Sequence, residues 1–265
     1  MSSAGARRRP ALLLLVAPAV AAAVALSAWF AAGHESAAEK RAFAATRSEP
    51  LRLFSSLPLY WGEARDIGAM LNGKAPRHWA RAAIEQQRPL QPIDTLDART
   101  LAGAHDLLIA QPRPLSPEEN VALDQWVARG GRVLLFADPA LTAHSAFAVG
   151  DKRRPQDVVL LSPILGRWGL ALEFDEEQAL GERTVAIDRG ASLTVNLPGR
   201  FAKSSAGRGD AACRLSREAV IAQCTVGRGR VVAVADAALF EDATDSDLGA
   251  RRRALTELLE RAFPA

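Results

Sequence analysis

Two aspartates are the residues of this sequence best placed to do chemistry, because each directly follows an apolar run of the kind that forms a buried strand. These residues are Asp138 and Asp236. Ligands of open α/β sheets bind beyond the carboxyl ends of the strands, so both carboxylates are expected in one crevice with Ser55 and Ser56. Paired carboxylates hold a metal ion or perform acid–base catalysis. The alternative is that each aspartate caps the turn that follows it, and Pro139 favours this alternative for Asp138.

Arginines form a second set of candidate ligand-binding residues. Arg113 follows the strand predicted at 107–110, and Arg153 and Arg154 lie in a loop over 140–155. Guanidinium groups bind anions through paired hydrogen bonds, and long loops in compact domains often carry function. Solvated loop charge is the commoner use of such residues. Because Arg113 follows a predicted strand, it joins the two aspartates and two serines as a candidate ligand-binding residue.

Three aromatic residues, Tyr60, Trp61 and Trp79, are candidates to line a groove for a partner protein, with core packing as the alternative. The sequence has no G-x-S-x-G nucleophile elbow, dinucleotide-binding fingerprint or phosphate-binding loop, and its four histidines are scattered. It therefore predicts no catalytic residue, no cofactor and no metal site.

The two cysteines, Cys213 and Cys224, lie eleven positions apart. A disulfide is the expected state of such a pair in an exported domain, and two buried free thiols are the alternative. In the chain-entropy model, closing this loop adds about 3 kcal/mol of stability.

The stretch from 105 to 139 is the unit that must position these candidates. It predicts a buried strand over 107–110, a helix, and a second buried strand over 133–137. Ser116 and Glu119 form a capping box at the start of the helix, and Gly130 suits its end. This is a βαβ unit, so the two strands should be parallel and the crossover right-handed.

The remaining elements follow from apolar periodicity and turn residues. Helices are expected around 67–71 and over 76–88, 162–169 and 248–263, with a helical turn after Asp97. Strands are expected at 51–54, 92–94, 170–174, 185–187, 193–195, 213–215, 219–226 and 230–235, and a Gly/Ser-rich loop over 201–210. Alternating strands and helices followed by hairpins predict a doubly wound, mostly parallel α/β sheet with an antiparallel β extension.

The N-terminal part predicts the compartment. Residues 11–32 carry no charge and are long enough to cross a bilayer, and Arg7–Arg9 precede them. The positive-inside rule then places residues 1–10 in the cytoplasm. Residues 33–49 are expected to form a linker, and residues 50–265 an exported domain. The alternative is a signal peptide cleaved near Leu26–Ala28. The expected location is the inner membrane, with one span and a periplasmic C-terminal domain.

The composition excludes few classes of function. The chain has 265 residues, of which 49% are hydrophobic and 24% charged, and a formal net charge of +3. This is an ordinary globular balance. Basic patches with interleaved aromatic residues are not seen, so no nucleic-acid partner is expected.

Several segments together resemble one known domain. They are Asp106–Ala110, Leu115–Glu119, Trp126–Val127, Gly130–Gly131, Leu135–Pro139, and Val226–Val232 followed by Asp236 and Phe240. They look like the domain of auxiliary subunits of gliding-motility-type ABC transport systems and of related membrane-anchored proteins. The resemblance covers about residues 50–260 and implies a flavodoxin-like fold similar to class I glutamine amidotransferases without their catalytic cysteine. It supplies no catalytic residue.

The expected function is a non-catalytic, membrane-anchored periplasmic domain that binds a protein partner or small ligand, as an accessory of an ABC-type transport or envelope complex. Its expected partners are the inner membrane, through the N-terminal helix, and a protein of the envelope. The alternative is a hydrolase or metal-assisted enzyme that uses Asp138 and Asp236 at the strand ends.

Overall fold

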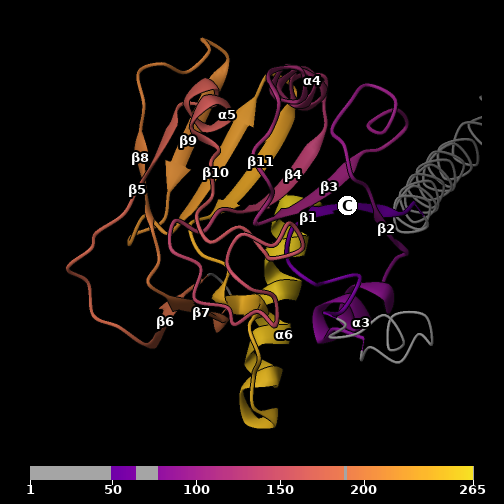
Figure 1. The fold of residues 1–265 in the computed structure, drawn as a ribbon. Helices are drawn as coiled ribbons and strands as arrows, with labels where there is room; N and C mark the ends of the chain where they lie inside the picture. Colours follow the sequence, from indigo (N-terminus) through magenta and orange to yellow (C-terminus); the bar gives the residue numbers. More distant parts are fainter. Residues whose placement is uncertain (1–48, 64–76, 188–189, 265) are drawn as a thin grey trace, which may run out of the picture. The chain divides into compact units, whose positions relative to one another are not determined.

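A central mixed sheet organises the computed structural model, which describes residues 49–63, 77–187 and 190–264 (Figure 1). In the described residues its strand order is β2-β1-β3-β4-β11-β10-β9. The strands are β1 (Leu51–Ser55), β2 (Leu90–Pro92), β3 (Asp106–Ala110), β4 (Arg132–Phe136), β9 (Ala211–Leu215), β10 (Ile221–Val226) and β11 (Gly229–Val234). All neighbours from β2 to β11 are parallel, whereas β10 and β9 are antiparallel. The mostly parallel α/β sheet with an antiparallel extension is therefore confirmed.

The predicted βαβ unit forms from β3, helix α4 (Pro117–Ala128) and β4. Every residue of β3 is buried, as expected for a strand covered on both faces. The Ser116 side chain accepts the Glu119 N–H, and the Glu119 side chain accepts the Ser116 N–H, which completes the capping box. Gly130 follows the helix with a φ of +121°, a conformation that glycine adopts without steric cost.

Helices cover both faces of the sheet, because alternate residues of each strand point to opposite faces. Leu108 and Leu134 join the core formed with α3 (Trp79–Glu85) and α6 (Asp245–Ala262). Leu107 and Val133 join the core formed with α4 and α5 (Ser162–Arg167). Figure 1 shows α4 and α5 on one side of the sheet and α3 and α6 on the other. The doubly wound arrangement follows from this division.

Two small antiparallel sheets extend the domain. One pairs β5 (Leu170–Glu173) with β8 (Arg200–Lys203), and the other pairs β6 (Glu182–Ala186) with β7 (Ser192–Asn196). The loop predicted over 201–210 is wrong in its first part, because the backbone of 200–203 pairs with β5. The strand predicted at 92–94 is instead Leu90–Pro92, and beyond it the Ile93 N–H still donates to the carbonyl oxygen of Leu53 in β1 at 2.8 Å.

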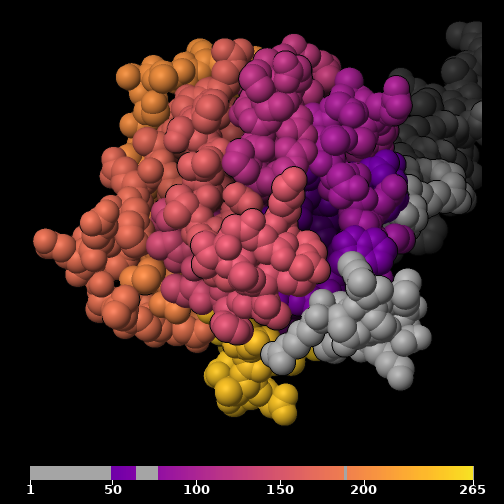
Figure 2. All heavy atoms as spheres, in the orientation of Figure 1, coloured from indigo at the N-terminus to yellow at the C-terminus, as the bar shows by residue number. Residues whose placement is uncertain are grey.

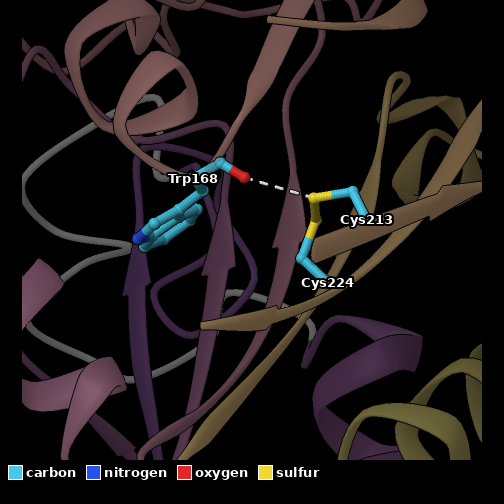
Figure 3. The surroundings of a disulfide bond; sticks show 3 residues. All are labelled: Trp168, Cys213 and Cys224. Carbon is cyan, nitrogen blue, oxygen red and sulfur yellow. Dashed lines mark hydrogen bonds between the residues drawn. A yellow bond between two sulfur atoms is a disulfide. The ribbon is translucent and has the colours of Figure 1, made fainter. Parts of the chain in front are cut away.

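The antiparallel strands β9 and β10 are joined by a disulfide, which confirms that prediction. Cys213 and Cys224 face each other in the register, with their Cα atoms 4.1 Å apart. The Sγ atom of Cys213 lies 3.2 Å from the carbonyl oxygen of the buried Trp168, on the side of the sheet that α5 covers (Figure 3). This is a contact rather than a hydrogen bond, because a disulfide sulfur has no proton to donate.

Replacing both cysteines by alanine is expected to lower the free energy of unfolding by about 3 kcal/mol, because the crosslink restricts the unfolded chain. Urea unfolding followed by circular dichroism measures the difference. Reductant should destabilise the parent chain by a similar amount and leave the double variant unchanged. Equal unfolding midpoints for parent and variant would contradict the prediction.

Within the described residues, no helix combines the length and the apolar character needed to cross a bilayer. The predicted anchor over 11–32, its flanking segment 1–10, most of the linker, and the helix expected around 67–71 lie outside those residues. The last helix, predicted from 248, begins at Asp245.

Candidate functional site

A crevice lies beyond the carboxyl ends of β1 and β2, beside the point at which the strand order reverses. The chain passes from β1 to β2 on one side of β1 and then crosses to β3 on the other side. Open α/β sheets bind ligands at such a switch point. The crevice has a volume of about 220 Å³. Its lining includes Ser55, Ser56, Tyr60, Trp61, Glu63, Asp94, Phe147 and Arg153. Of the candidate ligand-binding residues, the two serines and Arg153 line it, whereas Asp138, Asp236 and Arg113 do not.

Both serine hydroxyls are engaged by backbone groups, that of Ser55 within its own turn and that of Ser56 by two residues distant in the sequence. Ser55 Oγ accepts the Leu57 N–H at 3.0 Å. Ser56 Oγ donates to the carbonyl oxygen of Gln111 and accepts the Gln156 N–H at 3.1 Å. Neither hydroxyl hydrogen-bonds to a histidine among the described residues. The serines thus shape the floor of the crevice and are not paired with a general base.

Gln111 holds the carboxyl ends of β3 and β4 together, a role that the sequence analysis missed. Its side chain is fully buried. Nε2 donates to the carbonyl oxygens of Asp138 at 3.0 Å and Gln156 at 2.8 Å, and Oε1 accepts the Asp138 N–H at 2.9 Å. Its φ of +43° is unusual for a residue other than glycine. A polar residue between a buried strand and a proline was the available signal.

The two aspartates cap turns, which is the alternative weighed from the sequence. Asp138 accepts the N–H groups of Ala140 at 2.8 Å and Ala237 at 2.9 Å. Asp236 accepts the N–H groups of Ala238 at 2.7 Å and Asn196 at 2.9 Å. These bonds tie the end of β4 to the end of β11, and β11 to β7. Both carboxylates are at most 1% exposed.

Burial raises the pKa of these carboxyl groups. The pKa of Asp138 rises to about 6 because of burial, although two backbone N–H groups oppose the change. The pKa of Asp236 is raised by burial and then by the negative charge of Asp138. The pKa of Glu241 is also raised, mainly by burial. The two aspartates therefore lie close enough to interact, and in the described residues no group of three potential metal ligands forms.

The free energy of unfolding is expected to fall as the pH rises from about 4 to above 6. In this interval the native state holds a proton on Asp138 that the unfolded chain has released, so raising the pH favours unfolding. Urea unfolding at half-unit pH steps measures the slope. Asp138→Asn should reduce the slope without abolishing it, because the pKa values of Asp236 and Glu241 are raised as well, while an exposed control, Glu176→Gln, should leave it intact. An unchanged slope in Asp138→Asn would contradict the prediction.

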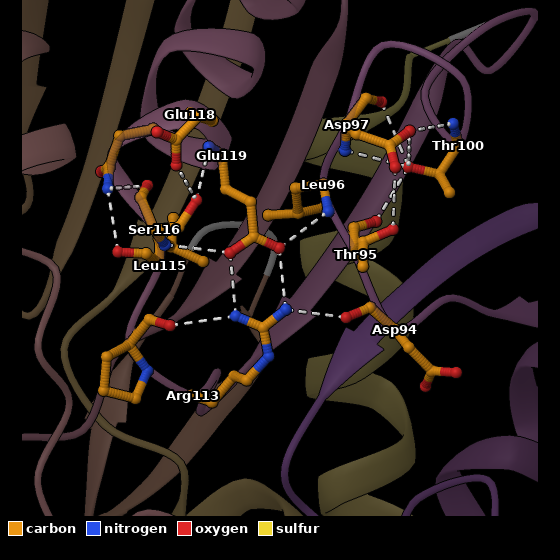
Figure 4. A network of polar contacts seen from close by, with 12 residues as sticks. Asp94, Thr95, Leu96, Asp97, Thr100, Arg113, Leu115, Ser116, Glu118 and Glu119 are labelled. Atoms are coloured by element: carbon orange, nitrogen blue, oxygen red, sulfur yellow. Dashed lines mark hydrogen bonds and ion pairs between the residues drawn. The ribbon is translucent and has the colours of Figure 1, made fainter.

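Arg113 is occupied by a carboxylate of its own chain (Figure 4). It forms two hydrogen bonds with Glu119, of 2.8 and 2.7 Å, and also donates to the carbonyl oxygens of Pro114 and Asp94. Arg113 lowers the pKa of Glu119 to about 2. Glu119 also accepts the Leu96 N–H at 3.1 Å. Arg113 thus joins the start of α4 to the segment after β2.

The other candidate arginines and aromatic residues have distinct surroundings. Arg153 pairs with Asp151 at 2.7 Å, and Arg154 pairs with Asp157 at 3.0 Å. Trp79 stacks on Phe240 with ring centroids 6.5 Å apart, which is the packing alternative. Tyr60 and Trp61 instead line the crevice.

Comparison with known proteins finds a partial match. The model of a family described as an ABC-type uncharacterized transport system matches residues 83–195, from within α3 to within β7. No curated protein matches the chain.

Solved structures resemble this chain only at low TM-scores. A catalytic mutant of a GH42 beta-galactosidase from G. stearothermophilus is 14% identical, with a TM-score of 0.46. The match covers 81% of this chain but only 30% of the galactosidase. The mmIFT52 N-terminal domain is 12% identical, with a TM-score of 0.47 and coverage of 80% and 97%. Likeness at this level says nothing about activity.

Proposed function

We propose that this chain is an auxiliary component of an ABC-type transport system, and that it acts as a non-catalytic binding domain. The observation that carries the proposal is the family match over residues 83–195, which includes the whole central βαβ unit. The finer fold assignment proposed is flavodoxin-like and similar to class I glutamine amidotransferases. It is supported by the parallel order β2-β1-β3-β4-β11, which corresponds to the 2-1-3-4-5 order of that fold.

The hydrogen bonds of the serine hydroxyls and of the strand-end carboxylates, which are the groups that an enzyme would use here, support a non-catalytic role. Ser55 and Ser56 are held by backbone groups, and each strand-end aspartate accepts two backbone N–H groups. The enzyme alternative has one observation in its favour, the raised pKa of Asp138, since catalytic acids often have shifted pKa values. We favour binding because both aspartates are closed off from solvent.

The proposed location is the periplasmic face of the inner membrane, with residues 11–32 as the anchor. The disulfide supports this proposal, because disulfides persist in oxidising compartments and are rare in the cytosol. Protease digestion of intact spheroplasts measures the topology. The C-terminal domain should be cleaved from outside, and protection of the domain would exclude the proposed location.

Crosslinking in native membranes tests the transport assignment. The full chain, tagged at its C-terminus, is expected to capture an ATP-hydrolysing subunit together with a membrane-spanning permease. Membranes that carry an unrelated single-span protein with the same tag provide the control. If neither subunit is enriched over that control, the proposal fails.

A further inference from the structure

The crevice beyond β1 and β2 has the size of a single long side chain. Its volume of about 220 Å³ is below the roughly 300–1,000 Å³ of pockets that enclose a whole small molecule. In Figure 2 the dark indigo atoms of the β1 region are recessed between neighbouring magenta and pink surfaces. Leu57, Pro58 and Pro92 give the lining an apolar part.

Trp61 supplies an open aromatic face at this crevice. It is 71% exposed, although its ring lies 4.8 Å from that of Tyr60 in an edge-on contact. Neighbouring rings already hold cations of this chain: Arg81 lies over Tyr60 at 3.7 Å, and Arg153 lies over Phe147 at 4.2 Å. No such cation lies over Trp61 in the described part of the chain, and tryptophan is the aromatic residue that attracts cations most strongly.

The uncompensated charge of the lining is negative. Arg153 is neutralised by Asp151, and the carboxylate of Glu63 accepts the Ser145 hydroxyl and the Ala146 N–H at 2.7 and 2.6 Å. Asp94 is the exception. Its carbonyl oxygen accepts Arg113, but its carboxylate points away from that network and has no hydrogen-bond partner among the described residues (Figure 4). The Asp94 charge acts on the Arg113 cation without a direct contact, and the Glu119 carboxylate already neutralises that cation.

We propose that the crevice is a docking pocket for a basic side chain, that of an arginine or a lysine, on a partner polypeptide. Its methylene groups pack against the apolar lining, and its cation binds between the Trp61 ring and the Asp94 carboxylate. Exposed tryptophans are enriched among the residues that dominate protein interfaces. The inference rests on the proposed function, because an auxiliary component needs a surface that recognises a protein.

A peptide titration of the full chain tests the pocket. With ¹⁵N-labelled tryptophan the chain gives five indole signals, and Trp61→Leu identifies that of Trp61. The probe is acetyl-Gly-Arg-Gly-amide, and the matched neutral probe carries citrulline in place of arginine. The arginine peptide should shift the Trp61 signal with a saturable, millimolar dissociation constant. Asp94→Asn should weaken binding at least five-fold, and Leu180→Ala and Glu176→Gln, on another exposed loop, should not.

Three results would overturn the inference: equal binding of the citrulline peptide, tighter binding of the corresponding glutamate peptide, or no shift of the Trp61 signal. The crosslinking experiment separates this failure from that of the proposed function. If transport subunits are captured equally by the parent chain and by Asp94→Asn, the pocket is not their contact. If the peptide binds as expected but no transport subunit is captured, the pocket stands and the transport assignment fails.

Discussion

Replacing Asp106 by alanine is expected to lower the free energy of unfolding by about 4 kcal/mol, because removing one partner from a buried ion network leaves uncompensated charge. Asp106 is the first residue of β3, and its side chain is fully buried. It accepts Arg88 Nη1 on one carboxylate oxygen and Arg132 Nε on the other, each at 2.5 Å. The alanine variant would leave both guanidinium groups without this carboxylate.

Urea unfolding of Asp106→Ala and of a surface control, Asp151→Ala, measures the difference. Asp151 also pairs with an arginine, but Arg153 is 62% exposed in its side chain, and exposed pairs contribute about 0–1 kcal/mol. The control should therefore unfold almost like the parent. A loss below about 1 kcal/mol in Asp106→Ala would show that the buried network contributes no more than a surface pair.

Replacing Gln111 by alanine is expected to cost about 3 kcal/mol, since each buried polar group left without a partner costs about 1–3 kcal/mol. The change leaves the Asp138 N–H and the Gln156 carbonyl oxygen without the partners that Gln111 provides. Because Gln156 also donates to Ser56, the floor of the crevice should loosen as well. Hydrogen exchange at the amide of Gln156 should accelerate.

One further variant separates hydrogen bonding from backbone strain at Gln111, and a second, at another position, provides a control. Gln111→Gly should be about 1 kcal/mol less destabilising than Gln111→Ala, because glycine adopts a positive φ without steric cost. Gln178→Ala is the matched control, as its side chain also donates to two carbonyl oxygens but at a partly exposed site. It should cost less than about 1 kcal/mol. Equal losses for Gln111→Ala and Gln178→Ala would contradict the proposed role.

Local signals in the sequence were sufficient for most of the fold. The capping box at Ser116 and the apolar runs over 107–110 and 133–137 predict elements that form with little change. The strand β8 was missed because Arg200–Lys203 is short and two of its four residues are charged. The segment is a strand because its backbone pairs with β5, and the composition of the segment alone does not indicate this pairing.

The site was predictable in place but not in detail. Parallel strands end at one edge of a sheet, so Ser55 and Ser56 could be placed at the crevice from their position at the end of β1. Arg113 follows β3 in the same way, but Glu119 binds it, and only the fold brings the two side chains together. The sequence marks Trp61 as a candidate for a partner groove. It does not predict that the Trp61 side chain is exposed, because this depends on the path of the loop in the folded chain.

Both edges of the central sheet resist extension by a strand from another molecule. The strand at one edge, β2, has only three residues and ends in proline, which offers no N–H to an incoming backbone. At the opposite edge, β9 carries Arg214 and is crosslinked to its neighbour. Fibril-like association through backbone pairing is thereby disfavoured, so the partner proposed above would have to bind through side chains rather than as an added strand.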